Sequence, residues 1–191
     1  MSSPLSRFAA GLVLAGSACA LAQAAPAAYT RVLPGSTVTF SATQMGVKMP
    51  GRFDRLTAQV DFVPGAPAQS KVSVSVDAAS VDAGSGQTNT LLTGSDWLDA
   101  KAYPQDRFVS SRFDAAGPGR YWVSGTFTAK GHSQPLRVLV VTHPVGANLA
   151  LDADFTLQRT ALGLGTGSWA DTSVVAAAIP VHVHLLVGPK G

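Results

Sequence analysis

Four histidines are the side chains of this sequence best suited to hold a metal ion, and two of them share one face of a strand. His182 and His184 stand two positions apart within a run of alternating polarity, so both side chains point to the same side. A catalytic zinc ion takes three protein ligands, and neither His132 nor His143 supplies an evident third. We therefore expect no metal site and interpret the pair as exposed side chains on the outside of the fold.

The remaining residues give little indication of a catalytic site. The sequence contains no GxSxG, HExxH, CxxC or phosphate-binding glycine loop. All 11 acidic residues are Asp, and most fall in turns or on the polar side of strands, where nothing pairs them as an acid and a base. The single cysteine, Cys19, lies in a predicted leader, so the mature chain has no thiol nucleophile. We predict a protein that is not an enzyme and that needs no cofactor.

Arg159 is the charged residue most informative about a binding site. It continues the apolar side of one alternating run, so that side ends in a guanidinium group. If this side lines a cavity, Arg159 stands near the rim and could bind an anionic or carbonyl head group with its fork of donors. The alternative is a structural ion pair with Asp171 or Asp99. The apolar residues that share its parity are Leu149, Leu151, Ala153, Phe155 and Leu157.

Residues 1–24 have the features of a secretory signal peptide. Arg7 gives a short positive region, an apolar run of 14 residues follows, and Ala22-Gln23-Ala24 fits the small-x-small cleavage pattern. The alternative, a transmembrane anchor, needs about 20 apolar residues. Removal of the leader leaves one domain, residues 25–191, without cysteine and with a net charge of +2. This charge is too small to indicate a nucleic-acid partner.

Polarity alternates with a period of two in eight segments of the mature chain, as expected for half-buried strands. Charged residues make up only 13% of the sequence, and 19 Gly, 12 Pro and no Glu argue against an all-helical protein. Most connections between the segments are short and rich in Gly and Pro, which favours antiparallel neighbours. The predicted strands are residues 37–42, 56–62, 72–77, 107–113, 121–128, 136–140, 149–158 and 175–185. The run 107–113 is less regular than the others, and its pattern predicts that Phe108 and Phe113 lie on opposite faces.

Eight antiparallel strands of this kind predict an all-β barrel, because closure removes the two free edges of the sheet. The inward residues are mostly small, which favours a cavity for one ligand over a packed interior. Residues 83–106, between the third and fourth strands, break the alternation and predict a short helical insertion, with a helix at residues 87–92. A long insertion in such a fold is either a functional lid or plug, or a cover packed over one open end.

Three groups of residues have the order and spacing of a known family. The first is Asp96-Trp97-Leu98-Asp99 with Tyr103-Pro104 and Phe108-Val109-Ser110-Ser111, and the second runs from Val123 to Gly131. The third is Leu157-Gln158-Arg159 with Gly163-Leu164-Gly165 and Trp169-Ala170-Asp171. Together they resemble the signatures of the YceI family of secreted lipid-binding proteins, over about residues 29–187.

This resemblance implies a fold, a ligand and a compartment. The fold is a lipocalin-like antiparallel barrel, with an elongated apolar tunnel for a long isoprenoid or acyl chain such as a polyprenyl diphosphate, a quinone or a fatty amide. Members are typically periplasmic, so we expect a periplasmic carrier. The Trp-Ala-Asp ending resembles a subgroup associated with membrane cytochrome b561, which favours a quinone. That cytochrome is a candidate partner, as is a second copy of the chain in a homodimer.

Candidate ligand-binding residues come from the inward parity of the strands and from the insertion. They are Phe40, Val74, Val123, Phe127, Phe155 and Leu157 on strands, Trp97, Leu98 and Tyr103 in the insertion, and Arg159 at the rim. The alternative function is that of an interaction module, in which a barrel filled by its own side chains docks on a membrane redox protein or a stress partner.

Overall fold

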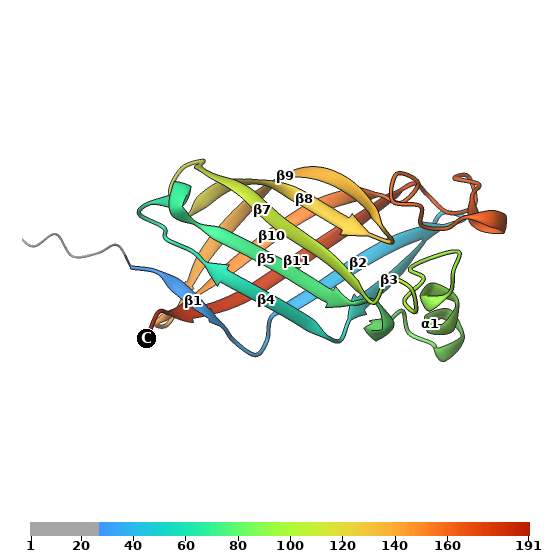
Figure 1. The fold of residues 1–191 in the computed structure, drawn as a ribbon, viewed down its shortest axis with the longest axis horizontal. Coiled ribbons are helices and arrows are strands. Elements are labelled where there is room, and N and C mark those ends of the chain that lie inside the picture. The colour runs from blue at the N-terminus through green and yellow to red at the C-terminus, as the bar shows by residue number, and fades with distance from the viewer. Residues whose placement is uncertain (1–26) are drawn as a thin grey trace, which may run out of the picture.

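The computed structural model describes residues 27–191, most of which belong to one antiparallel β-sheet (Figure 1). The predicted signal peptide, residues 1–24, lies outside the described residues. One α-helix, α1 (Gly86–Thr93), and three 3₁₀ turns, at Pro67–Gln69, Ala78–Ser80 and Gly167–Trp169, interrupt the strands. The strands are β1 (Tyr29–Val32), β2 (Thr37–Gln44), β3 (Val47–Phe53), β4 (Leu56–Asp61), β5 (Lys71–Asp77), β6 (Val81–Asp82), β7 (Gln105–Ala115), β8 (Arg120–Ala129), β9 (His132–Val145), β10 (Asn148–Gln158) and β11 (Ala178–Pro189).

The sheet is long and curled, with strands that wrap around the long axis of the molecule (Figure 1). Hydrogen-bonded neighbours follow the order β4-β5-β7-β8-β9-β10-β11-β2-β3-β6, and β1 pairs with the C-terminal end of β11. The backbone groups of Tyr29 and Phe62 exchange hydrogen bonds of 2.8 and 3.0 Å. At this end of the molecule β1 therefore links β11 to the residue that follows β4.

The all-β antiparallel class with one short helix is confirmed, but the predicted count of eight strands is wrong. The described residues form eleven, because β1 and β6 are too short to show an alternating pattern and the alternation of β3 was not recognised. β3 contains Pro50 and Gly51, which are both uncommon inside strands. It forms because a two-residue turn, Met45-Gly46, folds it back onto β2. The two turn residues have φ of 48° and 83°, as the tightest hairpin turns require.

The insertion contains the predicted short helix. Ser85 caps α1 by accepting a hydrogen bond on its Oγ from the N–H of Thr88, at 3.1 Å. The chain then turns without forming a second helix and packs Leu98 against Ala78 and Val81. In Figure 1, α1 and the loop of residues 159–177 occupy one end of the molecule, and β1 and the C-terminus lie at the other. None of the helices within residues 27–191 is long and apolar enough to span a bilayer.

Two clusters of buried apolar side chains hold the curled sheet together. Toward the β1 end, the ring of Phe62 meets Tyr121 edge-on with centroids 5.0 Å apart, and Phe113 lies 6.1 Å away. The other cluster includes Leu157 and Leu162 and continues toward the α1 end. The interior space that these clusters leave open forms the cavity described next.

Candidate functional site

The curled sheet encloses an apolar cavity of about 240 Å³. Its wall is built from the inward side chains of β2, β3 and β5 to β11, and α1 adds Leu91 and Leu92 at one end. Strand alternation explains this arrangement, because every second residue of a strand points to the same side. The aromatic side chains in the wall are Phe40, Phe53, Phe108, Phe113, Phe127, Phe155, Trp97 and Trp169.

Eight of the ten predicted ligand-binding residues lie in the wall of this cavity. They are Phe40, Val74, Trp97, Leu98, Val123, Phe127, Phe155 and Leu157. Six stand on strands, where period-two parity placed them, and the structure brings Trp97 and Leu98 to the same space from the insertion. Their contact with a ligand stays a prediction.

Tyr103 does not line the cavity. Its side chain is 40% exposed and covers the β8–β9 turn, where a Cβ added to Gly131 would meet the ring at 3.1 Å. Nothing in the sequence pattern distinguishes a Tyr that faces inward from one that packs on a turn. The structure thus places Tyr103, which belongs to the insertion, on the outer surface.

Arg159 is fully buried behind the cavity wall, and its guanidinium binds backbone oxygens. All three of its side-chain nitrogens donate, over distances of 2.7 to 3.3 Å, to the carbonyl oxygens of Leu164, Gly165, Asp171, Val175 and Ala176. Burial lowers the pKa of Arg159, and the negative charge of Asp171 opposes this effect. With its donors committed to the loop of residues 159–177, the guanidinium has a structural environment and does not stand at a rim.

The predicted ion pair between Arg159 and Asp171 takes a different form. Arg159 Nη2 donates to the main-chain oxygen of Asp171 at 3.3 Å, while the Asp171 carboxylate accepts from the N–H and Oγ of Ser173 at 2.8 and 2.7 Å. These last two hydrogen bonds are the main cause of the lowered pKa of Asp171. Arg159 and Asp171 therefore shape the same loop through separate contacts.

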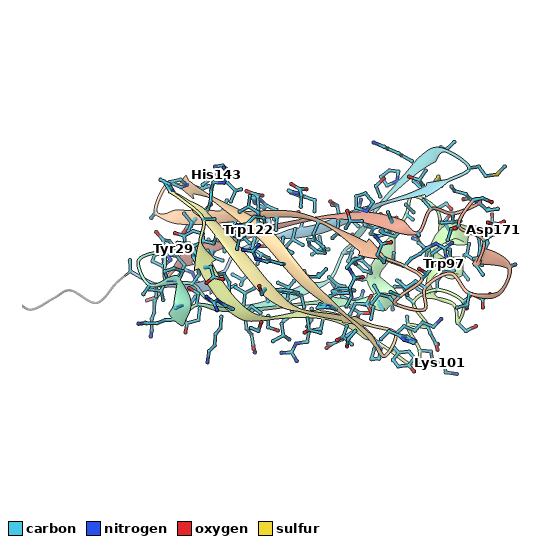
Figure 2. All side chains as sticks on the ribbon, turned by 90° about the horizontal axis from the view of Figure 1, so that it is seen from above. Tyr29, Trp97, Lys101, Trp122, His143 and Asp171 are labelled. Atoms are coloured by element: carbon cyan, nitrogen blue, oxygen red, sulfur yellow. The ribbon has the colours of Figure 1, made fainter. Side chains whose placement is uncertain are left out.

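The loop of residues 159–177 and the insertion join to cover the α1 end of the cavity. The N–H groups of Gly165 and Thr166 both donate to the main-chain oxygen of Asp96, at 2.7 and 2.9 Å. The rings of Trp97 and Trp169 lie 5.9 Å apart between centroids. Figure 2 shows Trp97 and Asp171 at this end, opposite Tyr29 and His143. Of the two roles predicted for the insertion, its geometry is therefore consistent with that of a cover packed over one open end of the barrel.

Asp106 is a wall residue that the sequence reasoning missed. Its side chain is 3% exposed, lies in the mostly apolar wall, and has no hydrogen-bond partner for Oδ1 among residues 27–191. Burial raises the pKa of Asp106 to about 7, and a hydrogen bond from the Lys130 N–H opposes this only in part. A signal was present in the sequence, because Asp106 has the parity of the inward Phe108.

A β-bulge in β7 corrects a second sequence inference, that Phe108 and Phe113 lie on opposite faces. The pairing with β8 runs from Ser110↔Gly125 to Arg112↔Ser124, so Ser111 is an extra residue. An extra residue switches the face of all that follow it. Both phenylalanine rings consequently point into the interior and line the cavity.

The histidine pair lies on the outside of the sheet and is matched by aspartates on β10. His182 Nδ1 lies 2.9 Å from Asp154 Oδ1, and His184 Nδ1 lies 2.7 Å from Asp152 Oδ1. Within residues 27–191, no group of three or more His, Cys, Asp or Glu side chains is arranged to hold a metal ion. These contacts are cross-strand pairs of the kind that stabilise sheets.

The chain matches a known domain family over residues 29–187, described as the YceI-like domain. A UPF0312 protein of Vibrio parahaemolyticus is 28% identical over 134 residues, which cover 70% of this chain and 71% of that protein. A UPF0312 protein of Shewanella denitrificans is 28% identical over 112 residues, and this match spans only 58% of the length of either protein.

Solved structures share the fold. BcnA of Burkholderia cenocepacia is 39% identical, with a TM-score of 0.77 over 79% of this chain and 95% of that chain. A structure from Saccharophagus degradans, described as a polyisoprenoid binding domain implicated in plant cell wall breakdown, has a TM-score of 0.68 over 86% of this chain and 99% of that chain. Its sequence identity of 15% makes it a likeness of fold.

Proposed function

Because this chain belongs to the YceI-like domain family, we propose that it binds a long-chain isoprenoid or acyl lipid, such as a polyprenyl diphosphate or a quinone, inside the curled sheet. This function rests on the apolar cavity, whose wall consists mostly of aliphatic and aromatic side chains from nine strands. The description of the Saccharophagus degradans structure as a polyisoprenoid binding domain supports the same class of ligand.

The form of the cavity suits a chain rather than a compact molecule. Its lining extends from Val140 and Leu185 in the body of the sheet to Leu91 on α1. Each methylene group transferred from water to such a wall contributes about 0.8 kcal/mol before entropic costs. Each methylene group that enters the cavity therefore adds to the retention of the ligand.

We interpret the curled sheet as a lipocalin-like barrel. The link that β1 makes from β11 to Phe62 closes the β1 end, and the insertion together with the loop of residues 159–177 covers the α1 end. A ligand would then enter where these covering segments part. In the same proposal the leader at residues 1–24 directs the protein to the periplasm, where it carries its lipid without modifying it.

Partners in this scheme are the lipid itself and a membrane protein that supplies or receives it. A cytochrome b561 is the candidate suggested by the Trp169-Ala170-Asp171 ending, and a quinone would be the corresponding cargo. The alternative function, an interaction module with a filled barrel, requires an interior occupied by side chains. The cavity of about 240 Å³ favours the carrier.

Extraction of the bound lipid tests the proposed function. The full chain is expressed with its leader, purified from the periplasmic fraction without detergent and measured by native mass spectrometry before and after organic extraction. We expect an adduct of several hundred daltons that the extraction removes and that has an isoprenoid or acyl composition. Empty protein in repeated preparations, with no change in tryptophan fluorescence on addition of prenyl lipids, would contradict the carrier function.

A further inference from the structure

Two polar atoms in the apolar cavity wall have no hydrogen-bond partner within residues 27–191. They are Oδ1 of Asp106 and Nε1 of Trp97. The two side chains are 3% and 8% exposed, and both line the cavity. Buried polar groups in folded proteins are nearly always hydrogen-bonded. Two unpaired buried polar atoms in one apolar cavity indicate that a group outside the chain supplies their hydrogen-bond partner.

The charged side chains that adjoin Asp106 on β5 and β7 bind other groups. Its cross-strand neighbour on β5 is Val76, and the adjoining Asp77 binds Arg55 with N–O distances of 2.8 and 2.9 Å. On β7 itself, Arg107 Nε donates to Ser73 Oγ at 3.0 Å.

The neighbours of Asp106 at the α1 end also leave its carboxyl without a cation. The Lys130 N–H donates to the carboxyl group, but the Lys130 ammonium group donates to the Gly163 oxygen at 2.9 Å. The guanidinium of Arg159 is bound by five backbone oxygens. Because burial dominates, the pKa of Asp106 rises to about 7, so the carboxyl carries a proton in mildly acidic solution and acts as an O–H donor.

We propose that Asp106 and Trp97 form a polar subsite at the α1 end of the cavity, which takes an uncharged oxygen acceptor of the bound lipid, such as a carbonyl or hydroxyl group. This presupposes the lipid-binding function proposed above and names the head group that the cavity accepts. The acid O–H and the indole N–H are both donors, so they match an oxygen acceptor. The cavity wall presents no cation among the described residues, so a diphosphate would enter it without a counter-charge.

A series of ligands with one chain length separates the head group from the tail. Geranylgeraniol, menaquinone-4, geranylgeranyl diphosphate and phytane all carry a twenty-carbon isoprenoid chain; the first three differ in head group, and phytane, which is saturated, has none. Their affinities are measured at pH 6 on delipidated protein by displacement of a fluorescent apolar probe. We expect the alcohol and the quinone to bind about 3- to 10-fold more tightly than phytane for each hydrogen bond formed. The diphosphate should bind least well.

Substitutions of Asp106 and Trp97 test whether these two side chains cause the preference for oxygenated lipids. Asp106→Leu and Trp97→Phe should each lose the part of the preference for oxygenated lipids that one hydrogen bond contributes, while phytane binds to Asp106→Leu as before. Asp106→Asn retains a donor, so its preference should persist and should not change with pH. The matched control is Asp114→Asn on the same strand, whose carboxylate pairs with Arg112 at 2.7 Å on the outside and whose loss should leave every affinity unchanged.

A pH series keeps the test decisive if Asp106→Leu does not fold. In wild-type protein the preference should fall between pH 6 and pH 8.5, as the carboxyl loses its proton, whereas Asp106→Asn should show no such fall. Equal affinities for all four ligands, or a preference for the diphosphate, would overturn the subsite and leave the carrier function standing. Failure of all four to bind would overturn the carrier function together with the subsite that depends on it.

Discussion

Arg159 and Gly165 fix each other's positions. Arg159 Nη1 donates to the Gly165 oxygen at 2.9 Å, and a Cβ added to Gly165 would lie 2.6 Å from the same nitrogen. Gly165 also has φ of 70°, in the left-handed region where other residues are strained. The buried guanidinium therefore both shapes the loop of residues 159–177 and requires glycine at this point of it.

Replacement of Arg159 should destabilise the fold. Arg159→Lys keeps the charge but cannot reach five carbonyl oxygens at once, and the buried acceptors left unpaired should cost at least about 2–4 kcal/mol. Chemical denaturation of the delipidated protein measures this loss. Arg112→Lys, at a side chain 72% exposed, is the control and should change the unfolding free energy by less than about 0.5 kcal/mol. Equal stability of the two variants would show that the carbonyl cluster contributes nothing.

Gly125→Ala should destabilise the sheet, because no space exists for a side chain there. A Cβ at Gly125 would collide with the Phe108 ring and the Val109 carbonyl oxygen, and overpacking of this kind costs about 1–3 kcal/mol. The matched control is Gly86→Ala in the first turn of α1, where a Cβ meets nothing within 4 Å. That change should be neutral or stabilise the protein by about 0.5 kcal/mol. Thermal unfolding compares both variants with wild type.

Ala153→Phe should block the cavity. Ala153 lines it from β10, and a benzyl group would occupy the space proposed for the lipid chain. We expect the affinity for twenty-carbon lipids to fall on the order of tenfold or more, because a filled space cannot accept further methylenes. Thr156→Phe adds the same ring on the same strand at an exposed position and should leave the affinity unchanged. Binding is measured by displacement of the fluorescent probe, with circular dichroism to verify folding.

The stability of the delipidated protein should decrease as the pH rises from about 4 to about 7. The pKa of Asp106 rises from 3.8 to about 7 on folding, so in this window the folded chain retains a proton that the unfolded chain releases. Raising the pH then favours unfolding, by up to about 4 kcal/mol, and above about pH 7 the effect levels off. Denaturation of wild type and Asp106→Asn across this range isolates the contribution, since the amide does not titrate. A difference between the two proteins that does not change with pH would contradict the prediction.

Met45→Asn should stabilise the β2–β3 hairpin. Met45 is 78% exposed and has φ of 48° in a two-residue turn, a conformation that Asn adopts more readily. We expect a gain of a few tenths to about 1 kcal/mol in unfolding free energy. Lys48→Asn, two positions after the turn and within β3, is the control and should be neutral or mildly destabilising, because Asn is unfavourable in strands.

Period-two alternation was sufficient to predict the class of the fold and most of the cavity wall. It identified inward residues such as Phe127 and Phe155, because apolar and polar residues alternate along a long strand with one buried side. It failed at β3, because Pro50 and Gly51 are uncommon inside strands. This strand forms because the Met45-Gly46 turn folds it back onto β2. It also failed at β7, because the extra Ser111 reverses the faces partway along the strand.

The roles of the charged residues could not be read from parity. Arg159 has the parity of the apolar wall, yet its partners are backbone oxygens of a loop whose path the sequence does not specify. Asp106 has the same inward parity as Phe108, but a carboxyl group in that position contradicts the rule that strand interiors are apolar. Functional constraint is expected at residues that depart from such a local rule.

The link that β1 makes to β11 has a consequence for the time course of folding. Ser36, directly before β2, accepts a hydrogen bond from the Leu186 N–H, across 150 positions of sequence. By contrast, β7, β8, β9 and β10 pair with their sequence neighbours, so they can assemble locally. Contacts over long separations carry the greatest loop-closure entropy and form slowly. A nascent chain can therefore build the middle of the sheet early, but its interior stays accessible until β11 has been synthesised and captures β1 and β2.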